Sequence, residues 1–169
     1  IVGFRLSAGE RVRDVWFGRL SHAATAELAA PVFLRRPQPP SAASLPAGAT
    51  QQRLALWTGG IAPTGDPNGG TQACSTELQV FLPPRDRASG TAVILCPGGG
   101  YVRHCTDTEC WPLISWFNQH GIAALILEYR LPGYTGGIDA LRAVQLCRAN
   151  AEALGVDPAK VGVVGFSAG

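Results

Sequence analysis

Hydrophobic residues gather in short runs along the second half of the chain. Apolar side chains fill residues 91–96, 122–129 and 161–165, which have the lengths typical of buried strands. Residues 77–82 place Leu, Val and Leu at every second position and end at two prolines, which predicts a further strand. The chain therefore contains at least four segments that favour a sheet.

Two segments between the last three runs have helical periodicity, residues 109–120 and 138–154. Gly121 and Gly155 follow these segments, and we expect them at the helix C-termini. Asp139 is expected in the first turn of the second helix, facing the positive end of its dipole. The order strand, helix, strand, helix, strand predicts an α/β architecture with a parallel sheet covered on both faces.

The earlier part of the chain gives weaker signals. Residues 54–57 form a short apolar run, and residues 58–71 are rich in glycine, proline and asparagine, which predicts a loop. Residues 1–53 are assigned no fold; a linker, the remnant of a transit or pro-segment, and a mistranslated upstream region are the alternatives. The domain prediction is an extension or linker over 1–53 and an α/β unit over 54–169.

Composition excludes several classes of protein. Hydrophobic residues make up 46% of the 169 residues and charged residues 15%, which is typical of a chain that forms a core. The net charge of +2 is scattered, and Arg35-Arg36 is the only adjacent basic pair, so we expect no nucleic-acid partner. The longest apolar runs, such as residues 122–127, are far shorter than the roughly 20 residues of a membrane span.

Five cysteines raise the question of disulfides and metals. Cys96 and Cys147 lie in apolar segments, which predicts buried thiols. Cys105 and Cys110 flank an acidic stretch, but no second ligand pair follows, so we predict no metal site. A disulfide between these two, or with Cys74, is the alternative for an exported protein; the sequence favours no compartment. No cofactor is expected.

Residues 165–169 read Gly-Phe-Ser-Ala-Gly and fit the pattern G-x-S-x-G directly after a predicted strand. A sharp strand-to-helix turn needs small flanking residues because larger side chains would collide with the strained backbone. Such a turn lifts the hydroxyl of Ser167 out of the carboxyl edge of the sheet, where a base can reach it.

A second glycine motif, Pro97-Gly98-Gly99-Gly100-Tyr101, follows an earlier predicted strand. Its bare N–H groups suit the oxyanion that acyl transfer creates, and each fixed donor contributes about 3–4 kcal/mol. A flexible turn and a phosphate-binding loop are the alternatives. The motif lacks the spacings G-x-G-x-x-G and G-x-x-x-x-G-K, which argues against nucleotide binding.

Together these segments resemble the α/β-hydrolase superfamily, and more narrowly the hormone-sensitive-lipase-like and bacterial acetyl-xylan or feruloyl esterase-like carboxylesterases. The resemblance covers about residues 54–169. It rests on four segments: LWTGGIAP (56–63), PGGGY (97–101), EYRLP (128–132) and GVDPAKVGVVGFSAG (155–169). It implies the N-terminal part of an α/β-hydrolase fold.

The resemblance also implies roles for particular residues. Ser167 would be the nucleophile, and the Ala168 N–H one oxyanion donor. The other donors would come from the backbone N–H groups of Gly98, Gly99, Gly100 and Tyr101. The sequence departs from the family at Pro97, where a histidine is usual, in the short loop after Pro132, and in the cysteine-flanked segment 102–104.

The triad order of this fold, serine, acid and histidine, leaves the base unassigned. His22, His104 and His120 all precede Ser167, so we expect the acid and the base beyond Gly169. His120 is interpreted as a cation at a helix C-terminus, and His104 as a solvated loop residue, with the acyl pocket as its alternative place.

The predicted protein is a serine carboxylesterase that acts on small-molecule or carbohydrate esters, with acetyl groups on carbohydrate as candidates. The chain lacks Met and ends in the elbow, so we expect it to be an inactive N-terminal piece. A prolyl-oligopeptidase-like peptidase and a non-catalytic remnant or binding protein are the alternatives.

Overall fold

The computed structural model describes residues 44–66, 68–131 and 135–169. The predictions made for residues 1–43, including His22, and for the loop after Pro132 lie outside the described residues. None of the described helices combines the length and the apolar character needed to cross a membrane.

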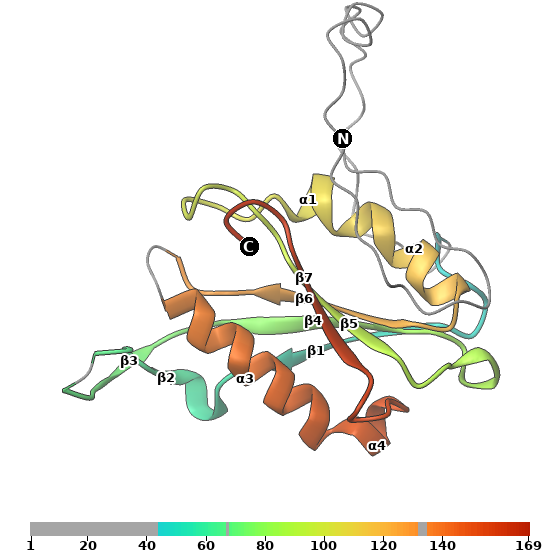
Figure 1. The fold of residues 1–169 in the computed structure, drawn as a ribbon, viewed down its shortest axis with the longest axis horizontal. Coiled ribbons are helices and arrows are strands. Elements are labelled where there is room, and N and C mark those ends of the chain that lie inside the picture. The colour runs from blue at the N-terminus through green and yellow to red at the C-terminus, as the bar shows by residue number, and fades with distance from the viewer. Residues whose placement is uncertain (1–43, 67, 132–134) are drawn as a thin grey trace, which may run out of the picture. The chain divides into compact units, whose positions relative to one another are not determined.

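A mixed sheet forms the centre of the described part (Figure 1). Its strand order is β1-β4-β6-β5-β7, with the bounds β1 Thr50–Ala55, β4 Glu77–Leu82, β5 Ala92–Cys96, β6 Ala123–Glu128 and β7 Val161–Gly165. β5 pairs parallel with both β6 and β7, which confirms the strand–helix alternation. β4 pairs antiparallel with β1 and β6, so the sheet is not parallel throughout. Within the described residues, α-helices occur only after β5, and parallel pairing needs such a crossover.

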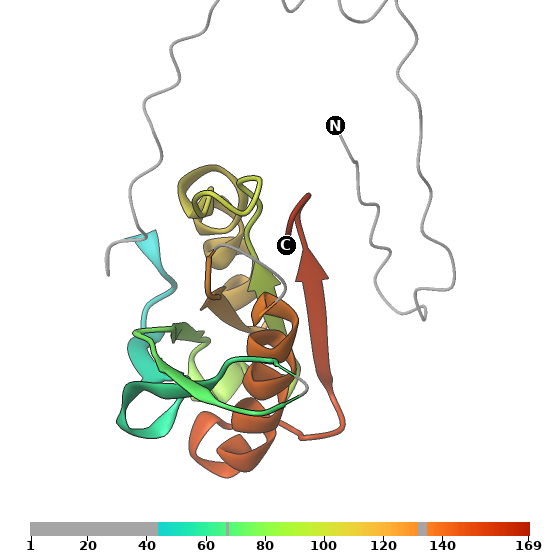
Figure 2. The same cartoon turned by 90° about the vertical axis from the view of Figure 1, so that its left-hand side faces the viewer.

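Helices cover both faces of the sheet, as Figures 1 and 2 show. On one face lie α1 (Thr106–Glu109) and α2 (Trp111–Gln119), and on the other α3 (Thr135–Ala149) and α4 (Ala151–Leu154). Alternate residues of the central strands enter opposite cores. Ile94 and Leu125 pack on the α3 side, whereas Leu95 and Ile126 pack on the α2 side. The two-sided hydrophobicity of these strands therefore reflects burial on both faces.

Each predicted helix is in fact divided in two. Residues 109–120 form the end of α1 and all of α2, which meet at the buried Cys110. Pro112 explains the break, because a proline lacks the N–H that would continue the helix and its ring crowds the carbonyl four residues earlier. The second helix is interrupted at Asn150, whose side-chain amide donates to the Leu146 carbonyl at 2.8 Å. Asparagine competes with helical hydrogen bonds in this way.

Both predicted helices end at the glycines that the sequence indicated, but the second helix begins earlier than predicted. Gly155 caps α4 with a φ of 66°, and Gly121 follows α2 with a φ of 72°. α3 begins at Thr135, three residues before the predicted start, so Asp139 lies beyond the first turn. The prediction that Asp139 faces the helix dipole is therefore wrong; its carboxylate is fully buried in an ion pair.

The segment predicted as a loop over 58–71 contains a small hairpin. A 3-10 turn (Thr58–Gly60) leads into β2 (Ile61–Pro63), which pairs antiparallel with β3 (Thr71–Ala73). These strands have only three residues each, which is too short for an alternating hydrophobic pattern to be recognised. The sheet itself begins at Thr50, because β1 pairs with β4 over its whole length.

Candidate active site

The G-x-S-x-G segment forms a tight turn at the carboxyl end of β7. Ser167 has a φ of 50°, a left-handed conformation that residues other than glycine rarely adopt. The Phe166 N–H donates to the Cys96 carbonyl at 3.0 Å, and the Gly169 N–H closes the turn on the Phe166 carbonyl at 2.8 Å. Ser167 is thereby held next to the end of β5, at the edge where the glycine motif begins.

Close backbone contacts require glycine at both ends of the G-x-S-x-G segment, Gly165 and Gly169. A Cβ at Gly165 would lie 2.4 Å from the Gly169 carbonyl oxygen. A Cβ at Gly169 would lie 2.0 Å from the carbonyl oxygen of Cys96 and 2.8 Å from that of Pro97. Real Cβ atoms do not approach backbone so closely, so a side chain at either position would push the turn away from β5.

The glycine motif after β5 lies beside the turn that carries Ser167 (Figure 1). Hydrogen bonds to its backbone carbonyl groups hold it in place. The Gly98 carbonyl accepts from the Cys105 N–H at 2.9 Å, and the Gly99 carbonyl from the N–H groups of Val102 and Arg103. In a trans peptide the N–H points opposite to the carbonyl. The N–H groups of Gly99 and Gly100 therefore point away from the loop, and neither has an acceptor within the described part of the chain.

One predicted oxyanion donor is occupied. The Gly98 N–H donates to Glu109 Oε2 at 2.5 Å, so in this structure it is not free to bind an oxyanion. Among the described residues, the N–H groups of Tyr101 and Ala168 have no acceptor, like those of Gly99 and Gly100. Four of the five predicted donors remain candidates.

Tyr129, the residue after β6, supports the same loop from the α3 side. Its hydroxyl donates to the Pro97 carbonyl at 2.6 Å, and its side chain is buried. Burial raises the pKa of Tyr129, and the nearby Cys96 thiol raises it further. The hydroxyl thus stays protonated and remains a donor over the whole physiological range.

His104 is not the solvated loop residue that the sequence indicated. It is half-buried and packs edge-on against the Tyr129 ring, with 4.6 Å between ring centroids. Its Nε2 is buried without a hydrogen-bond partner among the described residues. Burial lowers the pKa of His104, partly offset by the charge of Glu128 and a hydrogen bond with the Tyr129 backbone. The ring borders a cavity of about 370 Å³ that Glu128 and Arg130 also line.

His120 has the place that the sequence predicted, at the C-terminal cap of α2. Its Nδ1 lies 2.8 Å from the Trp116 carbonyl oxygen, and its ring stacks on that of Trp116. Of the two described histidines, neither has a hydrogen bond to Ser167. The described residues therefore contain a nucleophile candidate and donors without a paired base.

All five cysteines are free thiols, so neither disulfide alternative is present. Cys96 and Cys147 are buried as predicted, and Cys110 is buried as well. Burial raises the pKa of Cys96 to about 11 and that of Cys110 to about 12, which keeps both protonated. No group of His, Cys, Asp and Glu side chains among the described residues has the arrangement of a metal site.

A buried polar cluster near the site was not foreseen from the sequence. Arg130 and Asp139 form an ion pair, with Arg130 Nη2 at 2.8 Å from Asp139 Oδ1. The Trp57 indole N–H donates to the same oxygen at 2.9 Å, and Arg130 Nη1 donates to the Pro63 carbonyl. The cluster joins the end of β6, α3 and the hairpin segment. The position of Arg130, two residues after a buried strand, was the only local signal.

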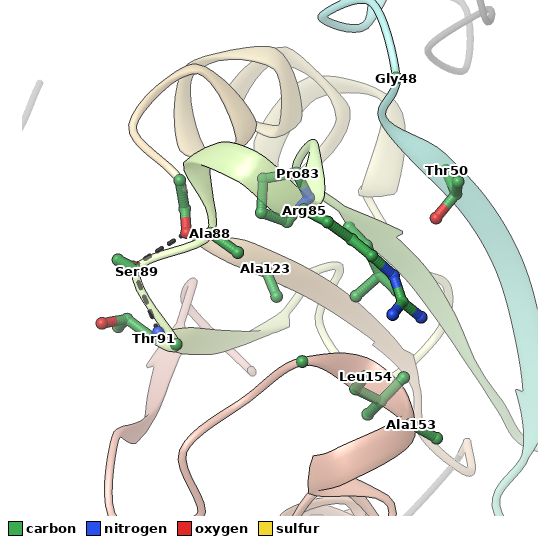
Figure 3. A pocket seen from close by; sticks show the side chains of 14 residues that line it. Gly48, Thr50, Pro83, Arg85, Ala88, Ser89, Thr91, Ala123, Ala153 and Leu154 are labelled. Atoms are coloured by element: carbon green, nitrogen blue, oxygen red, sulfur yellow. Dashed lines mark hydrogen bonds between the residues drawn. The ribbon is translucent and has the colours of Figure 1, made fainter.

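A cavity of about 560 Å³ lies at the opposite ends of the parallel strands. Figure 3 shows side chains that line it. It lies at the start of β5 and β6, where Thr91 and Ala123 line it, and the Arg85 side chain extends across it. Ser167 and the glycine motif are at the carboxyl ends of the strands. This cavity is therefore separate from the candidate active site.

Comparison with known proteins finds esterases among the proteins that this chain resembles. An acetylxylan esterase from Xylanibacter ruminicola is 34% identical over 96 residues, which are 55% of this chain and 20% of that protein. An ethyl acetate hydrolase from Pseudomonas putida is 36% identical over 101 residues, 54% of this chain and 31% of that protein. The chain thus spans a fifth to a third of the length of these curated relatives.

The fold has solved counterparts as well. The acetyl ester-xyloside bifunctional hydrolase from Caldicellulosiruptor lactoaceticus matches 73% of this chain and 44% of its own, with 31% identity and a TM-score of 0.57. The family model named BD-FAE matches residues 78–169, more than half of the chain, and includes both glycine motifs. The chain belongs to the BD-FAE family, within the α/β-hydrolase superfamily.

Proposed function

We propose that the protein from which this chain comes is a serine carboxylesterase with Ser167 as its nucleophile. One observation carries the proposal. Ser167 has a positive φ and lies on a turn that is hydrogen-bonded to the end of β5. In the loop that follows β5, the N–H groups of Gly99 and Gly100 point outward. A strained nucleophile beside unsatisfied backbone donors is the arrangement that acyl transfer uses.

The reaction proceeds in two steps. Ser167 Oγ bonds to the ester carbonyl carbon and its proton passes to a base; the alcohol then leaves with a proton as the carbon–oxygen bond breaks. Water repeats the attack on the acyl-enzyme, releases the acid and restores the hydroxyl. In both steps the carbonyl oxygen becomes an oxyanion, which the N–H groups of Gly99, Gly100 and Ala168 would stabilise. Each fixed donor contributes about 3–4 kcal/mol.

We propose short acyl esters, acetyl esters of carbohydrate among them, as the substrates. The support comes from the relatives, whose names describe hydrolysis of acetylxylan, ethyl acetate and an acetyl ester-xyloside. None of the three names describes a peptidase, which favours an ester over a prolyl peptide.

We propose further that residues 1–169 alone do not turn over substrate. Neither described histidine reaches Ser167, because His104 packs on Tyr129 and His120 caps α2. A serine hydroxyl without its base is a poor nucleophile, and losing a triad member costs roughly 10⁴–10⁶ in rate. The acid and the base would come from residues other than those described.

The test uses the complete product of the gene that encodes this chain. Hydrolysis of p-nitrophenyl acetate should be abolished by Ser167→Ala and unchanged by Ser115→Ala. Ser115 is a half-buried control on α2 whose hydroxyl accepts from the Gln119 side chain. Acetylated xylan and a prolyl peptide, tested side by side, separate esterase from peptidase. Activity retained by Ser167→Ala would refute the proposal, and turnover by residues 1–169 alone would refute its second part.

A further inference from the structure

We propose that Glu109 is a positioning residue for the oxyanion hole: its carboxylate fixes the first peptide plane of the glycine motif and thereby aims the Gly99 and Gly100 N–H groups. The inference rests on the proposed function, because it assigns a role in stabilising the oxyanion at Ser167.

Both polar atoms of the Pro97–Gly98 peptide are held by side chains. The Pro97 carbonyl accepts from the Tyr129 hydroxyl at 2.6 Å, and the Gly98 N–H donates to Glu109 Oε2 at 2.5 Å. A peptide plane bonded at its carbonyl alone can still tilt about that contact. With its N–H bonded on the opposite side as well, its orientation is set, because the two groups point in opposite directions.

The fixed Pro97–Gly98 plane restricts the orientation of the next two peptide planes, which carry the Gly99 and Gly100 N–H groups. From Gly98 the chain continues through the Gly98 carbonyl, bonded to the Cys105 N–H, and the Gly99 carbonyl, bonded to Val102 and Arg103. Gly99 has a φ of 130° and Gly100 a φ of 65°, so the loop has no preferred conformation of its own to maintain this path. Anchoring the first plane therefore limits how far the next two planes, which are bonded at their carbonyls alone, can tilt.

Glu109 itself is rigidly placed. It is the last residue of α1, with the buried Cys110 next to it and the buried Thr106 at the other end of the helix. Gly98 leaves room for the carboxylate, since a Cβ at Gly98 would lie 3.1 Å from both Glu109 oxygens and 2.6 Å from the Phe166 carbonyl oxygen. The contact thus depends on a glycine at the first position of the motif.

Glu109 could act through its charge or through the position it gives to the peptide plane. Its negative charge would oppose catalysis, so the two effects can be distinguished by experiment. A carboxylate near the developing oxyanion repels it, so electrostatics alone would slow the reaction. The charge-assisted bond to the Gly98 N–H is short and directional, so its benefit is geometric. A glutamine keeps the side-chain length and an acceptor oxygen without the charge. It should therefore preserve the function if position is what matters.

The experiment compares Glu109→Ala, Glu109→Gln and Asp107→Ala in the complete gene product. Asp107 lies in the same short helix, and no described residue hydrogen-bonds its carboxylate, which makes it a matched control. The readouts are kcat and KM for p-nitrophenyl acetate and the inhibition constant of a trifluoromethyl ketone, which forms a tetrahedral adduct with the serine.

Glu109→Ala should lower kcat about 10- to 100-fold, less than the 10²–10³ for removing an oxyanion donor outright, and leave KM within about twofold. The trifluoromethyl ketone should bind more weakly by a similar factor. Glu109→Gln should remain within about threefold of the unchanged protein in every readout, and Asp107→Ala should match it. An unchanged kcat in Glu109→Ala, or a loss that glutamine does not restore, would overturn the inference.

A second variant covers the case in which Glu109→Ala does not fold. Tyr129→Phe removes the bond at the other end of the same peptide plane and keeps the aromatic ring. It should lower kcat with little change in KM, and an unaffected kcat would contradict the inference that the Pro97–Gly98 peptide plane must be held at both ends. The outcome is also distinct from failure of the proposed function. If Ser167→Ala is inactive while Glu109→Ala and Tyr129→Phe are both fully active, only this inference fails.

Discussion

Arg130 and Asp139 form a bidentate ion pair in the interior, with side chains only 6% and 0% exposed. Arg130 Nε lies 3.1 and 3.0 Å from the two carboxylate oxygens, and the Arg130 backbone N–H donates to Oδ2 at 2.9 Å. The Trp57 indole completes the set at Oδ1. One carboxylate of α3 thus fixes the segment that follows β6, the strand from which Tyr129 reaches the glycine motif.

Asp139→Ala should destabilise the protein by about 3–5 kcal/mol, because it leaves the Arg130 charge buried without a partner. Urea unfolding followed by tryptophan fluorescence measures the change. Asp157→Ala is the control, since Asp157 pairs with Lys160 at 3.7 Å and both side chains are largely exposed. The control should lose at most about 1 kcal/mol. Equal losses in the two variants would contradict the assignment of Asp139 as a buried anchor.

Gly169→Ala should reduce esterase activity about 100-fold, even though it adds a single methyl group. The added Cβ would lie 2.0 Å from the Cys96 carbonyl oxygen, so the turn must move away from β5 and Ser167 with it. A displacement of about 1 Å at a reacting group costs about that factor. Gly162→Ala in β7, the strand that precedes the turn, is the control, because its Cβ would meet nothing nearer than 3.9 Å. The measurement is kcat/KM for p-nitrophenyl acetate, and equal activity of the two variants would argue against the steric account.

The thiols should fall into two classes of reactivity. Burial raises the pKa of Cys96 to about 11, so at pH 8 only about one such thiol in a thousand is a thiolate. Iodoacetamide should therefore modify the half-buried Cys74 and Cys105 in the native protein. Cys96, Cys110 and Cys147 should react only after denaturation, as peptide mapping by mass spectrometry would show. Rapid native labelling of Cys110 would contradict its burial.

His104 should make stability depend on pH in the acidic range. Burial lowers its pKa in the folded protein, so the unfolded chain binds the proton more tightly. Its contribution is fully present above the unfolded pKa of about 6.5 and is lost as the pH falls below that value. Urea unfolding at pH 7.5 and 5.5 should show a smaller decrease for His104→Phe, which keeps a ring against Tyr129. An identical decrease in both proteins would show that other groups cause it.

The order of the strands and helices from residue 77 onward was predictable, because β5 and β6 are buried on both faces and their hydrophobic runs are continuous. Breaks inside the helices were less visible. Pro112 gave a signal for the division of α1 from α2, whereas the break at Asn150 depends on a side chain bonding to its own helix. The strands β2 and β3 of the hairpin, with three residues each, are too short to show an alternating pattern.

The glycine motif and the serine turn could be identified from the amino-acid sequence, since both are local: they need particular residues at fixed spacing after a strand. Tertiary structure alone decided which donors remain. The Gly98 N–H is occupied by Glu109, and Asp139 is paired with Arg130 rather than with a helix dipole. These contacts join separate elements, and their geometry depends on how those elements pack. Spacing along a chain does not specify the orientation of a peptide plane or the partner of a buried charge, whereas the packed fold does.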